Sequence, residues 1–134
     1  MNNKFKPNKI TNIVYYSLIF IVFLLAIIRW ISAFNSDIVV INHEINSHIS
    51  NFSLSLLFYL AVGFSWTLQG ISFKKIVLLG IVCMIANILC ETVMGFMNTP
   101  DLIDAVYGIA GTIISFCFLW ASRKWGLTHI LDAE

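Results

Sequence analysis

Four long apolar stretches constrain the fold of this chain more than any other feature of its sequence. They cover about residues 13–34, 52–71, 76–97 and 102–122. Each is long enough to cross a hydrocarbon layer about 30 Å thick, because a helix rises about 1.5 Å per residue. Only 11% of the 134 residues are charged, against about 25% in a typical soluble domain. We therefore expect a single all-α domain, a polytopic integral membrane protein with four transmembrane helices.

The basic residues predict how these helices are oriented. Seven of the eight lie before the first stretch, between the second and third, or after the fourth: Lys4, Lys6, Lys9, Lys74, Lys75, Arg123 and Lys124. In a four-helix topology these three segments share one side of the membrane, and cytoplasmic segments are enriched in Lys and Arg. Both termini are therefore predicted to be cytoplasmic. Residues 35–51 are then expected outside, as a polar loop with room for a short surface helix.

Small and polar residues mark one face of each of the last two predicted helices. On the third stretch these are Gly80, Asn87, Glu91, Gly95 and Asn98, and on the fourth Asp104, Gly108, Gly111 and Ser115. Steps of three, four or seven residues return to the same helix face. Because small residues let helices approach closely in lipid, we predict a tight hairpin of the third and fourth helices with Gly95, Gly108, Gly111 and Ser115 at its seam. Packing alone would explain most of these glycines.

Two aspartates lie where the fourth helix is expected to begin. Thr99 and Pro100 have the order of an N-cap and a first helical residue. Asp101 and Asp104 would then occupy the first turn, where the helix dipole favours negative charge. This structural role explains the two aspartates as well as a functional role does.

Glu91 has no such explanation, because it lies about six residues inside the third stretch. A charge at such a depth costs about 2.5–3.5 kcal/mol, so intramembrane glutamates usually pair or act in function. We predict an ion pair with Arg29, the one basic residue within an apolar stretch. Such a pair would serve either as a structural lock or as half of a polar site.

The segment from His43 to His48 reads HEINSH and resembles a zinc-protease motif, but its spacing does not fit. That motif needs histidines four residues apart, whereas these are five apart and about 140° round a helix. His43 and Glu44 are therefore expected to be solvated loop residues. Cys83, Cys90 and Cys117 lack metal-site spacing, and no serine or cysteine has a recognisable base. We expect no metal and no cofactor, and the sequence favours a protein that is not an enzyme.

Several of these residues together resemble the VanZ-like membrane proteins over about residues 48–118. The resemblance is carried by His48-Ile-Ser-Asn51-Phe52, by Glu91, by Asn98-Thr-Pro-Asp101-Leu-Ile-Asp104, and by Gly108 and Gly111. Glu91, Asp104 and Gly111 match best, and the family's histidine corresponds to His48 or to Asn51. The family's loop arginine is replaced by residues 98–100, and Gly108 stands where an asparagine is expected. These departures leave the identity of a ligand open.

The resemblance implies a bacterial inner-membrane protein, multi-pass, linked to glycopeptide (teicoplanin-type) resistance or to the cell envelope. With the residues above, it leads us to expect an outward-facing polar pocket for lipid or amphiphile headgroups, formed by Glu91, Asp104, Arg29, Asp101, Asn87, His48 and Asn51. Two alternatives stay open: a small proton-coupled exporter, and a membrane accessory subunit. Expected partners are membrane lipids, amphiphilic small molecules, a second copy of the chain or a membrane partner protein. A net charge of +1 argues against nucleic acid.

Overall fold

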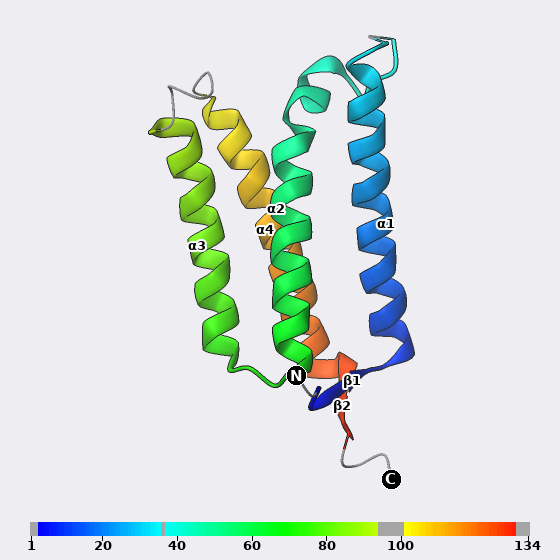
Figure 1. Ribbon diagram of the computed structural model, residues 1–134, viewed down its shortest axis with the longest axis vertical. Coiled ribbons are helices and arrows are strands. Elements are labelled where there is room, and N and C mark those ends of the chain that lie inside the picture. The colour runs from blue at the N-terminus through cyan, green and yellow to red at the C-terminus, as the bar shows by residue number, and fades with distance from the viewer. Residues whose placement is uncertain (1–2, 36, 94–100, 131–134) are drawn as a thin grey trace.

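Four long helices form an elongated bundle in the computed structural model, which describes residues 3–35, 37–93 and 101–130 (Figure 1). The helices are α1 (Lys9–Ser32), α2 (His43–Leu68), α3 (Phe73–Thr92) and α4 (Leu102–Ala121). All four are long and apolar enough to cross a membrane. The prediction of a helical chain with four candidate spans is thereby confirmed.

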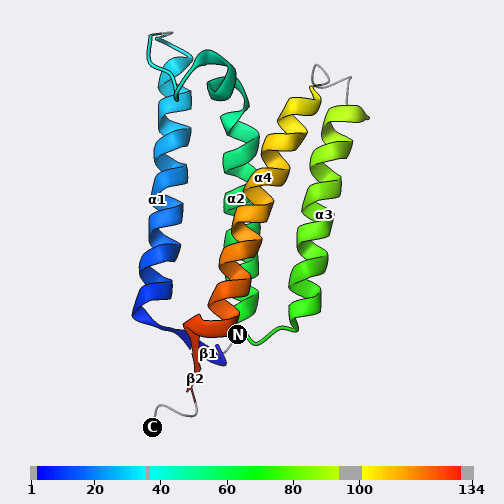
Figure 2. The same ribbon diagram turned by 180° about the vertical axis from the view of Figure 1, so that it is seen from behind.

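The centre of the bundle is the contact between α2 and α4, with α1 and α3 on either side (Figures 1 and 2). Among the buried residues of α2, one set recurs every three or four positions: Asn46, Ile49, Ser53, Leu56, Leu60, Gly63 and Thr67. This is the spacing of one helix face. A larger share of α2 and α4 is buried than of α1 and α3.

The outward faces of the helices are apolar. Phe20, Leu54, Leu78 and Val106, one from each helix in turn, are all largely exposed. Soluble monomers rarely expose broad apolar surface, whereas such a surface needs no covering when it faces lipid tails. The bundle therefore has the outer surface expected of helices that face lipid.

The seam of small residues on α4 faces a different helix from the one predicted. A Cβ added to Gly111 would meet the carbonyl oxygen of Phe52 and, at 3.1 Å, the backbone nitrogen of Leu56. The Ser115 hydroxyl donates to the carbonyl of Leu56 at 2.8 Å. Both partners belong to α2, so the prediction that these two residues join α4 to α3 was wrong. Helical spacing shows which residues share a face, but it does not show which helix that face meets.

α3 and α4 are also in contact, and at Gly108 the side chain of Asn87 fills the space between them. A Cβ on Gly108 would collide with the amide group of Asn87, so the missing side chain makes room for that amide. The expected seam residue Gly95 lies outside the described residues.

The second helix begins earlier than its hydropathy predicted. Residues 43–51 were expected in a loop, yet α2 starts at His43, after an N-cap at Asn42 whose side chain accepts from the Ile45 amide at 2.8 Å. Asn46 and Ile49 then lie on the buried face of α2. A helix can begin in a polar sequence when its first turn is capped and one face is covered.

The starts and ends of the other helices also differ in detail. Asn8 caps α1 by accepting from the Thr11 amide at 2.8 Å, so α1 begins at Lys9 rather than near residue 13. Asp101 is the N-cap of α4 and not a first-turn residue, because its carboxylate accepts from the Ile103 amide at 2.9 Å. The predicted cap, Thr99, and residues 94–97 of the third stretch lie outside the described residues. Asp104 is in the first turn, as expected.

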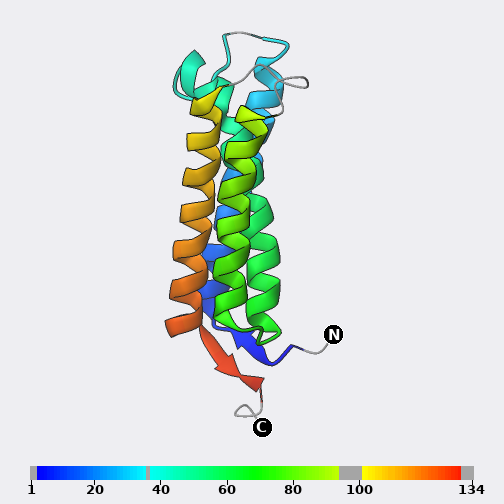
Figure 3. The ribbon, with the colours of Figure 1, turned by 90° about the vertical axis from the view of Figure 1, so that its left-hand side faces the viewer.

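Two short strands join the ends of the chain, a feature that was not predicted. Strand β1 (Phe5–Pro7) pairs antiparallel with β2 (Leu127–His129), which follows a π-helical turn at Ser122–Gly126. The strand pair lies below the bundle, with both termini at the same end (Figures 1 and 3).

Candidate functional site

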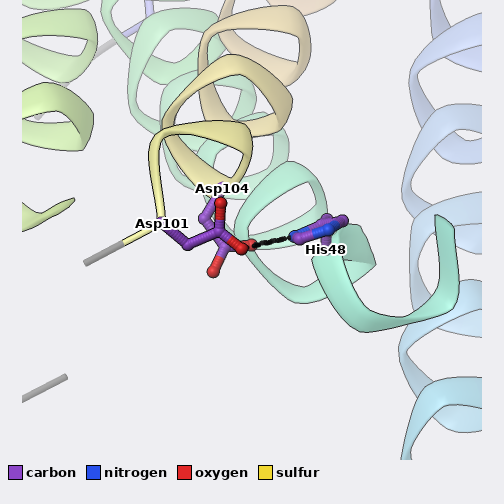
Figure 4. Close-up of side chains that lie close together, drawn as sticks. All are labelled: His48, Asp101 and Asp104. Atoms are coloured by element: carbon purple, nitrogen blue, oxygen red, sulfur yellow. Dashed lines mark hydrogen bonds and ion pairs between the residues drawn. The ribbon is translucent and has the colours of Figure 1, made fainter. Parts of the chain in front are cut away.

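Polar side chains from two helices meet at the end of the bundle opposite the termini. His48 lies near the start of α2, and Asp101 and Asp104 lie at the start of α4. Figure 4 shows the imidazole of His48 directed at the two carboxylates. His48 and two aspartates more than fifty positions further along the chain therefore form one cluster, here called the His48 cluster.

The geometry of the His48 cluster is tight. Nδ1 of His48 lies 2.8 Å from Oδ1 of Asp104 and 3.8 Å from Oδ2 of Asp101. His48 is 7% exposed, and the side chains of Asp104 and Asp101 are 19% and 39% exposed. The Tyr107 ring lies 5.3 Å from the imidazole and covers part of it. The cluster thus joins α2 to α4 and stays accessible through Asp101.

One imidazole cannot balance both carboxylates. A protonated His48 supplies one positive charge against two negative ones, and a neutral His48 supplies none. The amide groups at the start of α4 offset part of the remaining charge, since a helix N-terminus favours anions. The ion pairs formed among the described residues are both made by His48.

Glu91 stands beside this cluster at the end of α3. It is 6% exposed, and its Oε2 accepts from the backbone amide of Asp101 at 3.4 Å. The carboxylate therefore links the end of α3 to the start of α4. It holds the backbone of one member of the His48 cluster.

The predicted ion pair of Glu91 with Arg29 is not among the ion pairs of the described residues, so that prediction was wrong. Arg29 instead donates from Nη1 to the hydroxyl of Ser32 at 3.3 Å. Arg29 belongs to α1 and Glu91 to α3, and these helices flank the central pair from opposite sides (Figures 1 and 2). Similar depth in two helices does not bring their side chains together unless the helices are neighbours.

Asn46 is a buried polar residue that the sequence reading missed. Its Nδ2 donates to Ser32 at 2.9 Å, and its Oδ1 accepts from the amide of Val40 at 3.1 Å. These bonds fix the connection between α1 and α2. The signal was present, because Asn46 precedes Ile49 and Ser53 at helical spacing, but it was read as part of a loop.

A groove of about 480 Å³ lies between α2 and α3. Its walls are apolar along Leu54, Phe58, Leu79 and Val82, and polar side chains lie toward the end near the His48 cluster. These polar residues are Asn51, Ser55, Asn87 and Glu91. Three of the predicted pocket residues, namely Asn51, Asn87 and Glu91, therefore line one groove.

Asn87 organises the polar part of this groove. Its Oδ1 accepts from the Ser55 hydroxyl at 3.0 Å, and its Nδ2 donates to the Cys83 carbonyl at 2.9 Å. With Gly108 of α4 against the same amide, the side chain lies at a junction of three helices. Ser55 was not predicted as a site residue, and its role depends on this contact.

No family model, curated protein or solved structure matches this chain. The resemblance to VanZ-like proteins therefore stays a prediction. Function has to be argued from the groove and the cluster themselves.

Proposed function

We propose that this membrane protein binds an amphiphile, with its hydrocarbon chain in the groove between α2 and α3 and its polar headgroup at Asn51, Asn87 and Glu91. One observation carries the proposal: the groove is apolar along its length and polar only at one end. That division matches the two parts of a lipid-like molecule.

The polar end supplies the affinity. A hydrocarbon chain gains little when it leaves lipid for an equally apolar groove, so the walls provide shape and not driving force. Hydrogen bonds at the headgroup are stronger when one partner is charged. Amide groups and a buried carboxylate favour a headgroup rich in donors, such as an ammonium or hydroxyl group, over a bare phosphate.

Orientation belongs to the same proposal. With Lys74, Lys75, Arg123 and Lys124 at the end of the bundle that holds the termini, the positive-inside rule makes that end cytoplasmic. The groove's polar end then faces the outer leaflet of a bacterial inner membrane. Such a position fits the envelope role that the VanZ-like resemblance implies.

Labelling of single cysteines tests this orientation. In a chain whose native cysteines are replaced, Asp37→Cys should react in intact cells with a thiol reagent that cannot cross the membrane. Thr128→Cys, at the opposite end of the bundle, should react only after the cells are opened. Reaction of Thr128→Cys in intact cells would place the termini outside and contradict the proposed orientation.

Binding of defined lipids tests the groove. Protein purified in detergent should retain phosphatidylethanolamine, which carries an ammonium group, in preference to phosphatidic acid, as measured by mass spectrometry of the intact complex. Glu91→Gln should reduce the retention of phosphatidylethanolamine by about tenfold, the ratio that corresponds to losing about 1.4 kcal/mol.

A blocked groove is the matched control. Ala86 lines the groove and Ala26 lies on the exposed face of α1. Ala86→Phe should remove bound lipid, whereas Ala26→Phe adds the same side chain elsewhere and should leave binding unchanged. Equal lipid retention by these two variants would exclude the groove as the binding site.

A further inference from the structure

The His48 cluster has the composition of a metal site, which the sequence was predicted to lack. We propose that His48, Asp101 and Asp104 bind a divalent transition-metal ion such as Zn²⁺. This inference does not depend on the amphiphile groove, because His48, Asp101 and Asp104 do not line it.

The positions of the ligand atoms fit such an ion. Nδ1 of His48 and one carboxylate oxygen each from Asp101 and Asp104 lie within 4.8 Å of one another. Ligands about 2.0–2.2 Å from a tetrahedral zinc ion are roughly 3.4 Å apart. The two distances from Nδ1, 2.8 Å and 3.8 Å, lie on either side of that separation. Small side-chain movements are therefore enough to bring all three ligands onto one ion.

The charge of the cluster favours a divalent cation. Two carboxylates face one imidazole, and a neutral imidazole together with a 2+ ion would balance them fully. The effect is large here because His48 is 7% exposed and Asp104 is half-buried, so solvent screens the charges weakly. Imidazole nitrogen with carboxylate oxygen is a ligand set that suits zinc, whereas Ca²⁺ and Mg²⁺ prefer oxygen alone.

The surroundings of the cluster support binding as well. His48 comes from α2, so the site is more than the acidic first turn of α4. Its buried ring nitrogen is aimed at both carboxylates (Figure 4). Glu91 accepts from the backbone amide of Asp101 at 3.4 Å, which links the residue that carries one ligand to the end of α3. The partly exposed Asp101 leaves a route from the aqueous side and room for a water ligand.

Metal analysis of the purified protein tests the proposal. Protein without a histidine tag would be treated with a chelator, exchanged into metal-free buffer and titrated with ZnCl₂. One ion per chain should bind, by elemental analysis and calorimetry, and the melting temperature should rise as zinc is added, since a ligand of the folded state stabilises it. The same concentration of Mg²⁺ or Ca²⁺ should not reproduce that rise.

Substitutions assign the ion to this cluster. His48→Ala and Asp101→Asn should each weaken zinc binding at least tenfold, whereas His43→Ala, on the exposed side of the same helix, should not. Cys90→Ser should also keep full affinity, which separates the cluster from an exposed thiol. If His48→Ala does not fold, Asp101→Asn decides the question, because Asp101 is the most exposed of the three ligands and is not the close partner of His48. Failure of the wild-type protein to bind zinc, or unchanged binding by Asp101→Asn, would overturn the proposal and leave the amphiphile groove unaffected.

Discussion

Gly111→Leu is expected to lower the free energy of unfolding by more than the about 1–3 kcal/mol typical of an overpacked core. The position faces the backbone of α2 at Phe52 and Leu56, and a backbone cannot rotate away as a side chain can. The larger residue must separate α2 from α4, which form the centre of the bundle. Unfolding in detergent, followed by circular dichroism as denaturant is added, measures the loss.

Two variants of the same helix serve as controls for Gly111→Leu. Val106→Leu changes an exposed position of α4 and should unfold like the wild type. Gly108→Leu should cost less than Gly111→Leu, because the group that it meets is the side chain of Asn87. A Gly111→Leu protein with wild-type stability would show that α2 and α4 do not approach closely at this residue.

Asn46→Ala should destabilise the protein by about 1–3 kcal/mol, the cost of leaving a buried hydrogen-bonding group without its partner. The change removes the acceptor of the Val40 amide and the donor to Ser32 at once. Ser32 ends α1, and Val40 lies in the connection from α1 to α2, so Asn46 fixes that connection at both points. Proteolysis of residues 37–42 should therefore accelerate along with the loss of stability.

The neighbouring residue provides the control for Asn46→Ala. Ser47 is exposed, and its hydroxyl donates only to the Glu44 carbonyl within the same helix. Ser47→Ala should change stability by no more than about 0.5 kcal/mol. Equal effects of the two substitutions would show that the buried amide of Asn46 contributes nothing beyond helix propensity.

Hydropathy predicted the number of helices because a crossing of lipid requires a minimum apolar length, and each of the four stretches has it. Hydropathy did not predict the start of α2, because this first part of the helix contains His43, Glu44 and Asn46 and its buried face is partly polar. The N-cap of α4 was predicted at Thr99, two residues before its observed position at Asp101. Both residue types are favoured at N-caps, so the sequence alone did not decide between them. The number of helices thus follows from the sequence more reliably than the residues at which each helix begins and ends.

The candidate site was only partly predictable for a different reason. The sequence indicated that Glu91, Asp101 and Asp104 lie near one end of the bundle. The VanZ-like resemblance led us to expect His48 and the aspartates in one pocket, but helical spacing alone did not indicate that the imidazole would face them. Nor did it indicate that Arg29 would lie on the far side of the central helices. Helical periodicity fixes the direction of a side chain relative to its own helix, whereas neighbours are set by the packing of all four helices. The sequence did not show that α2 would contact α4 most extensively and would have α1 and α3 on either side.

The pairing of β1 with β2 has a consequence for the order in which the molecule is completed. The first strand leaves the ribosome before any helix, but its partner follows only after α4. The sheet therefore cannot form until all four helices have been synthesised, although α1 can pack against α2 before then. Pairing of the two strands ties the earliest-made helix to the latest.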